Sequence, residues 1–98
     1  MSGGNLTVER EILIDFRRVN DKDAAMLEWA IAARDRLKIV HIAHRIKGAS
    51  LSIGATRLAT ISESIENAGR ANDLTTVELE IGVFQTELKR LNTYLDAV

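Results

Sequence analysis

The chain has 98 residues, no cysteine, and 13 Lys and Arg residues against 14 Asp and Glu residues. This length predicts one domain with a single core, and the lack of cysteine excludes disulfides and thiolate metal sites and fits a reducing compartment. The formal net charge of −1 argues against nucleic acid as a partner. No apolar run approaches the roughly 20 residues that span a bilayer, which argues against direct membrane contact.

The N-terminal residues 1–5 have no periodicity, and we expect them to form a flexible leader or an engineered remnant. From about Thr7, a candidate N-cap, apolar residues recur at alternating three- and four-residue spacing, which predicts a helix to about Ala30. Asn20 and Asp23 are polar positions in that row. The sequence therefore leaves two alternatives open, one long helix or two helices separated by a break near residues 19–22.

Three further helices are predicted after the first. The second spans residues 36–53 and ends at Gly54, and the third runs to about Arg70 before a loop at residues 71–73. The fourth has the clearest apolar repeat, made of Val77, Ile81, Phe84, Leu88, Leu91 and Leu95. Short connections predict antiparallel neighbours. We therefore expect an all-α domain over residues 6–98, an antiparallel up-down four-helix bundle.

The start and the middle of the fourth helix give two local expectations. Asp73 or Thr75 would cap its N-terminus, because short oxygen-bearing side chains satisfy the free N–H groups there. Gly82 lies beside the core row in mid-helix, where glycine destabilises a helix unless it serves packing. It predicts a close approach to another helix.

The stretch His44-Arg45-Ile46-Lys47-Gly48 predicts a reactive surface in the middle of the second helix. At about 100° per residue, Lys47 and Gly48 share a face with His44, and the core residues lie on the other side; these are Ile39, Ile42, Ile46, Ala49 and Ile53. An exposed neutral imidazole is a nitrogen nucleophile near pH 7. Lys47 supplies a mobile positive charge for a phosphoryl group, and Gly48 leaves room for another molecule's backbone. This pattern predicts a phosphoryl-transfer surface.

Apolar residues also surround His44 on this face. Leu37, Val40 and Leu51 fall within about 40° of it and predict a patch that a protein partner covers, unless helix ends or the N-terminal segment bury some of them. His41 lies one turn before His44, and an i,i+3 histidine pair could chelate a metal. Zinc requires three or four ligands, however, and no further ligand lies on this face. We therefore expect no metal site and interpret His41 as a rim residue of the partner surface.

The same residues resemble the histidine phosphotransfer (HPt) domain family. Its pattern is a histidine, any residue, an aliphatic residue, lysine and glycine, followed six residues later by Gly-Ala. The matching residues are His44, Ile46, Lys47, Gly48, Gly54 and Ala55. The resemblance continues into the third helix at Leu58, Ile65, Glu66, Asn67 and Arg70, and so covers nearly the whole chain.

The resemblance implies a phosphorelay intermediate of the kind found at the end of hybrid sensor histidine kinases. Its histidine, here His44, accepts a phosphoryl group from a receiver-domain aspartate and passes it to a response-regulator aspartate, with Lys47 assisting and Gly48 leaving room. The receiver brings Mg²⁺, so no cofactor of the chain's own is expected. No nucleotide-binding loop is present, which excludes autonomous kinase activity. We expect a monomer, located in the cytoplasm or at the cytoplasmic end of an inner-membrane sensor kinase.

Two residues of the third helix leave alternatives open. Some family members carry glutamine in place of Glu66, and a carboxylate there would repel a phosphate, so the role of Glu66 is open. Arg70 matches a basic position near the family's site, where it would contact the partner. Alternatively, it forms an ordinary surface ion pair with Glu66 one turn earlier. For the whole chain, the alternative function is a non-catalytic helical adaptor or dimerisation module that binds a partner through the apolar patch around His44.

Overall fold

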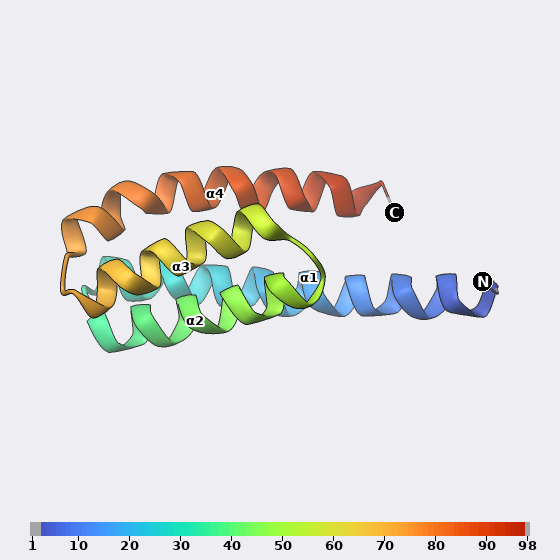
Figure 1. Cartoon of the computed structure of the whole chain (residues 1–98), viewed down its shortest axis with the longest axis horizontal. Helices are drawn as coiled ribbons and strands as arrows, with labels where there is room; N and C mark the ends of the chain where they lie inside the picture. The colour runs from blue at the N-terminus through green and yellow to red at the C-terminus, as the bar shows by residue number, and fades with distance from the viewer. Residues whose placement is uncertain (1–2, 98) are drawn as a thin grey trace.

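The computed structural model describes residues 3–97, and their side chains from residue 9 onward. Four helices follow one another along the chain: α1 (Gly3–Ala32), α2 (Arg36–Ser52), α3 (Thr56–Arg70) and α4 (Leu74–Asp96). They run alternately up and down in a narrow bundle that measures 48 × 20 × 19 Å (Figure 1). The predicted all-α, antiparallel up-down bundle is confirmed.

Helix α1 differs from its prediction at its start, and in its middle it adopts one of the two alternatives that the sequence left open. It begins at Gly3 rather than at Thr7, so residues 3–5, expected in a leader, are helical, whereas residues 1–2 lie outside the described part. It also continues without a break through Asn20 and Asp23, which are only 2% and 6% exposed. Both polar side chains face the bundle, and packing against the other helices keeps the helix regular at these positions.

Each connection between helices has three residues, one of them with a left-handed backbone. The φ angles are 53° at Arg34, 78° at Gly54 and 57° at Asn72. A residue in this conformation ends a helix and reverses the chain direction. The side chains of Asp35 and Asp73 then cap α2 and α4 by accepting a hydrogen bond from the backbone N–H three residues on. Asp73, rather than Thr75, is therefore the cap of α4.

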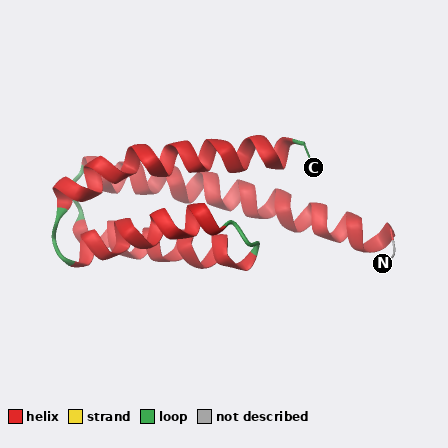
Figure 2. Ribbon diagram, turned by 45° about the horizontal axis from the view of Figure 1, so that its top comes forward, coloured by secondary structure: helices red, strands yellow, loops and turns green. Residues whose placement is uncertain are grey.

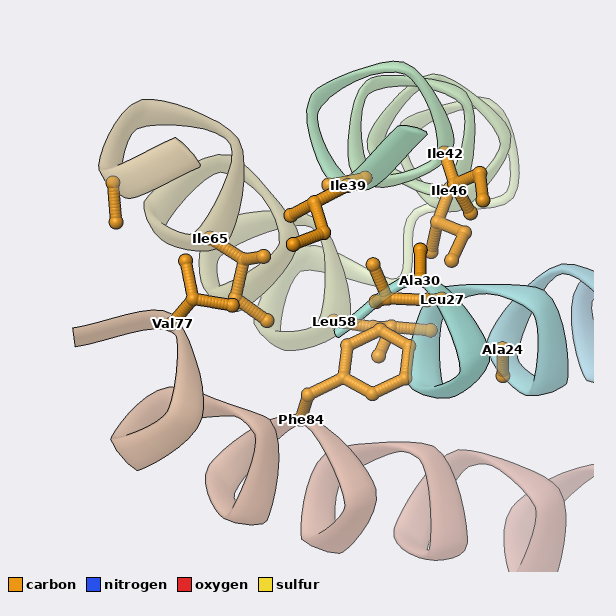
Figure 3. Close-up of a cluster of buried hydrophobic side chains, with 12 residues drawn as sticks. Ala24, Leu27, Ala30, Ile39, Ile42, Ile46, Leu58, Ile65, Val77 and Phe84 are labelled. Carbon is orange, nitrogen blue, oxygen red and sulfur yellow. The ribbon is translucent and has the colours of Figure 1, made fainter. Parts of the chain in front are cut away.

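All four helices contribute to one aliphatic core with a single phenylalanine at its centre (Figure 3). Its buried members are Ala24, Leu27, Ala30, Ile39, Ile42, Ala43, Ile46, Leu58, Ile65, Ala68, Val77 and Phe84. The Phe84 ring lies beside Leu27 and Leu58, and Ile39 and Ile46 point toward the core from α2. This confirms the predicted inner positions Ile39, Ile42 and Ile46, whereas Ala49 and Ile53 are only partly buried and their predicted place in the core is wrong.

The N-terminal part of α1 extends past the ends of the other three helices (Figure 2). Further along, α1 and α4 are joined by polar contacts. Gln85 donates a hydrogen bond to Glu28 at 3.2 Å, Asn92 donates one to Asp21 at 2.9 Å, and Arg17 pairs with Asp96. The α2–α3 hairpin, which carries the predicted reactive residues, lies on the other side of the bundle from these contacts.

The close helix approach expected at Gly82 is absent from the described structure. Gly82 is exposed, and an added Cβ would meet no atom within 4 Å, because this side of α4 faces outward. The tight contact lies instead at Gly69 on α3, where an added Cβ would lie 2.8 Å from Cγ2 of Val40 on α2.

We predict that Asn20→Leu stabilises the protein. Neither side-chain atom of Asn20 has a hydrogen-bond partner among the described residues, although the residue is only 2% exposed. Leucine would remove two unsatisfied polar atoms from the apolar row of α1, a gain of about 1–3 kcal/mol. Urea unfolding followed by circular dichroism measures this gain. A lower unfolding midpoint in the variant would show that the amide is satisfied in solution.

Candidate functional site

His44 lies in the middle of α2 on the side that turns away from the core. Its side chain is 63% exposed, whereas that of Ile46, two residues on, is fully buried. The helical rotation of about 100° per residue separates these two directions. The imidazole is therefore accessible to a second protein while its helix is fixed by the core.

The ring of His44 contacts a buried carboxylate on α3. Nδ1 of His44 lies 2.9 Å from Oε2 of Glu66, whose side chain is only 4% exposed. The same Oε2 accepts a hydrogen bond from Arg70 at 2.8 Å, and Nζ of Lys47 lies 2.9 Å from the other oxygen, Oε1. The Glu66 carboxylate thus contacts three nitrogen-bearing side chains from two helices.

These contacts determine the protonation of the site. Burial raises the pKa of Glu66, but the hydrogen bonds from Arg70, Lys47 and His44 outweigh it and lower that pKa from 4.5 to about 2. Glu66 is therefore ionised near neutral pH and can only accept hydrogen bonds. The hydrogen between the two groups must then reside on Nδ1 of His44, which leaves the lone pair of Nε2 free in the neutral ring.

Lys47 is held close to the histidine by two glutamates. Its side chain is only 20% exposed, with Nζ at 2.9 Å from Glu66 and 3.7 Å from Glu63. The hydrogen bond with Glu66 is the main cause of a raised pKa at Lys47, so the ammonium stays charged. Arg70 forms the i,i+4 pair with Glu66 that the sequence allowed, but its partner is buried rather than at the surface.

The other residues predicted for the partner surface differ in exposure. Leu37 and Leu51 are 74% and 60% exposed, and His41 is exposed as well. Val40 is half-buried rather than exposed, because its Cγ2 points at Gly69 and much of its side chain packs against α3. Gly48 is exposed, and an added Cβ there would meet no atom within 4 Å. A partner's backbone therefore has room beside Gly48.

Within residues 3–97, no group of three or more His, Asp or Glu residues is arranged to hold a metal ion. The carboxylate nearest to His44 is already engaged by Lys47 and Arg70. In the same part of the chain, none of the helices combines the length and the hydrophobicity that spanning a bilayer requires.

Glu66 is the residue whose role the sequence did not reveal. From the sequence it was expected to conflict with a phosphate, but its carboxylate faces Nδ1 of His44 and is neutralised by two cations. A signal for this arrangement existed in the spacing, because Lys47 follows His44 by one turn and Arg70 follows Glu66 by one turn. Only the antiparallel pairing of α2 and α3 brings the two pairs together.

Most of the chain matches one known protein family. The family model of the Hpt domain matches residues 11–98. The chain belongs to the Hpt domain family. This membership gives it a histidine phosphotransfer role in a phosphorelay, with receiver domains as the kind of partner.

The fold of this Hpt domain is also found in a solved structure. The crystal structure of histidine-containing phosphotransfer protein B from Pseudomonas aeruginosa PAO1 superposes with a TM-score of 0.87 at 24% sequence identity. The match covers 90% of this chain and 76% of that protein. No curated protein sequence matches the chain.

The lowered pKa of Glu66 predicts a specific loss of stability in acid. Between pH 4.5 and about 2, the unfolded chain binds a proton at Glu66 that the folded Hpt domain does not. The stabilisation from this ionised carboxylate is therefore complete above pH 4.5 and is lost as the pH falls to about 2, on the order of 3 kcal/mol. Urea unfolding of the wild type and of Glu66→Gln at several pH values measures it. The stability difference between the two proteins should shrink across this range, and a constant difference would contradict the assignment.

Proposed function

We propose that this Hpt domain carries a phosphoryl group on Nε2 of His44, accepts it from a receiver-domain aspartate and passes it to the aspartate of a response regulator. The observation that carries the proposal is the hydrogen bond from Nδ1 of His44 to the buried carboxylate of Glu66 at 2.9 Å. It fixes the ring tautomer in which the exposed side of the imidazole carries the nucleophilic lone pair.

The chemical step is a reversible displacement at phosphorus. The lone pair of Nε2 attacks the phosphorus of an aspartyl phosphate, the N–P bond forms, and the bond from phosphorus to the aspartate oxygen breaks, which returns a free carboxylate to the receiver. Because Nδ1 keeps its hydrogen, the phosphorylated ring carries a positive charge. Glu66 stabilises that charge, as a carboxylate beside an imidazolium does in other catalytic sites. A cationic ring is also a good leaving group, so the phosphoryl group can be passed on.

The cations next to Glu66 balance the charge that the phosphoryl group brings. Lys47 and Arg70 lie on either side of the carboxylate, at 2.9 and 2.8 Å, and both have further N–H donors. These donors can turn toward phosphoryl oxygens without leaving Glu66 unpaired. We expect Mg²⁺ to come from the acidic pocket of the receiver, where it neutralises charge at the transferring group.

The face around His44 fits a protein that supplies this pocket. Leu37 and Leu51 expose apolar surface at the two ends of α2, and Gly48 leaves space beside the ring. All residues of the site come from α2 and α3 of one chain, so we expect a monomer to suffice. The lack of cysteine agrees with a cytoplasmic location.

His44→Gln should abolish phosphoryl uptake and leave the fold intact, because the side chain lies largely in solvent. The assay incubates the variant with a phosphorylated receiver and Mg²⁺ and follows the label, while circular dichroism reports the helices. His41→Gln, on the same face, is the matched control and should take up the label.

The two variants also separate carrier from adaptor. Loss of the label in His41→Gln and not in His44→Gln would move the phosphorylation site to His41. If the wild type binds receivers tightly but takes up no phosphoryl group from any of them, the chain is an adaptor.

Leu51→Glu should weaken receiver binding by more than about 1 kcal/mol, because docking would bury an unpaired charge. The fold should persist, since Leu51 is 60% exposed. Leu79→Glu is the matched control, because Leu79 is 73% exposed but lies on α4, and it should bind receivers like the wild type. Isothermal titration calorimetry measures both. Equal affinities for the two variants would exclude Leu51 from the docking face.

A further inference from the structure

Among the glycines whose surroundings the structure describes, Gly69 on α3 lies in the closest contact, and this contact is with α2. A Cβ at this position would lie 2.8 Å from Cγ2 of Val40 and 3.5 Å from Cγ2 of Ile39. It would also approach the backbone nitrogen of Val40 at 3.9 Å. Gly48, Gly54 and Gly82 have no atom within 4 Å of the same point. Gly69 is therefore the one of these four glycines whose missing side chain is required by packing.

This contact lies one helical turn from the phosphorylation site. Val40 precedes His44 by four residues on α2, and Gly69 follows Glu66 by three residues on α3, so each pair shares a helix face. The spacing of the two helices at Gly69 therefore also sets how far the Glu66 carboxylate lies from the imidazole. The observed 2.9 Å leaves little room for a longer contact, because hydrogen bonds weaken beyond about 3.2 Å.

We propose that Gly69 is a positioning residue for phosphotransfer: it lets α3 approach α2 closely enough for Glu66 to hold Nδ1 of His44. This inference rests on the proposed function only where it concerns transfer rates. The geometric part, that Gly69 controls the tautomer of His44, stands on the contacts alone.

The neighbours of Gly69 cannot give way easily to a methyl group. Val40 is β-branched, and in a helix such side chains have one strongly preferred χ1 rotamer, so its Cγ2 cannot rotate away at low cost. A Cβ needs about 3.5–4.0 Å to a carbon neighbour. Starting from 2.8 Å, some part of this contact must shift, and because the Val40 rotamer is stiff we expect the two helices to separate locally. Alanine has a higher helix propensity than glycine, so Gly69→Ala should favour the α3 helix itself. Its effect on the site should be the opposite, because the contact between Glu66 and His44 is disturbed.

The test measures the tautomer of His44 in Gly69→Ala by long-range ¹H–¹⁵N NMR of the imidazole rings, with the His41 signals as an internal reference. We expect the Nδ1–H form to lose its dominance and the rate of transfer from a phosphorylated receiver to fall by about tenfold or more. Gly82→Ala is the control, because it adds the same methyl group to a helix without a neighbour within 4 Å. It should keep both the wild-type tautomer and the wild-type rate.

A double variant separates spacing from general damage. Val40→Ala removes the methyl group that the added Cβ at position 69 would strike, so Gly69→Ala combined with Val40→Ala should regain the Nδ1–H form. If Gly69→Ala alone does not fold, the double variant still must fold with the wild-type tautomer. A wild-type tautomer in folded Gly69→Ala, or an altered one in the folded double variant, would overturn the proposal. If Gly69→Ala has an altered tautomer but the wild type takes up no phosphoryl group, the positioning role is upheld and the proposed function is refuted.

Discussion

The site depends on the buried carboxylate of Glu66 and on the three nitrogen-bearing side chains that contact it. A lone carboxylate as enclosed as that of Glu66 would be strongly destabilising, and an incomplete set of partners would shift its pKa upward until it bound a proton. Here Lys47, Arg70 and His44 supply the compensation from two helices. The ionised state of Glu66 is thus a consequence of how α2 and α3 pack, and the Nδ1–H tautomer of His44 follows from it.

The core and the site are linked because adjacent residues of α2 and of α3, whose side chains point about 100° apart, belong to the core and to the site respectively. Ile46 and Ile65 are fully buried, and the next residue along the chain in each case, Lys47 and Glu66, belongs to the polar network. A shift that disturbed the core would therefore also move the donors and the carboxylate. On the side of α2 that faces α1, Asp23 of α1 forms a bidentate pair with Arg45 of α2, at 3.0 and 2.8 Å.

Much of the fold could be predicted because its signals are local. Apolar spacing, the turn at Gly54 and the cap at Asp73 depend on residues within a few positions of one another, and the structure agrees with them. Predictions were wrong where tertiary packing outweighs the local pattern. Gly82 was expected to mark a close helix approach, but its side of α4 faces outward.

Helical periodicity along the chain was enough to predict a four-helix bundle and to place His44, Lys47 and Gly48 on one outer helix face. The contact of Glu66 with the imidazole and the close approach at Gly69, rather than at Gly82, are visible only in the folded chain. Both facts depend on the distance and register between α2 and α3. Those quantities arise from side chains meeting across the bundle, which residue spacing along one helix does not specify.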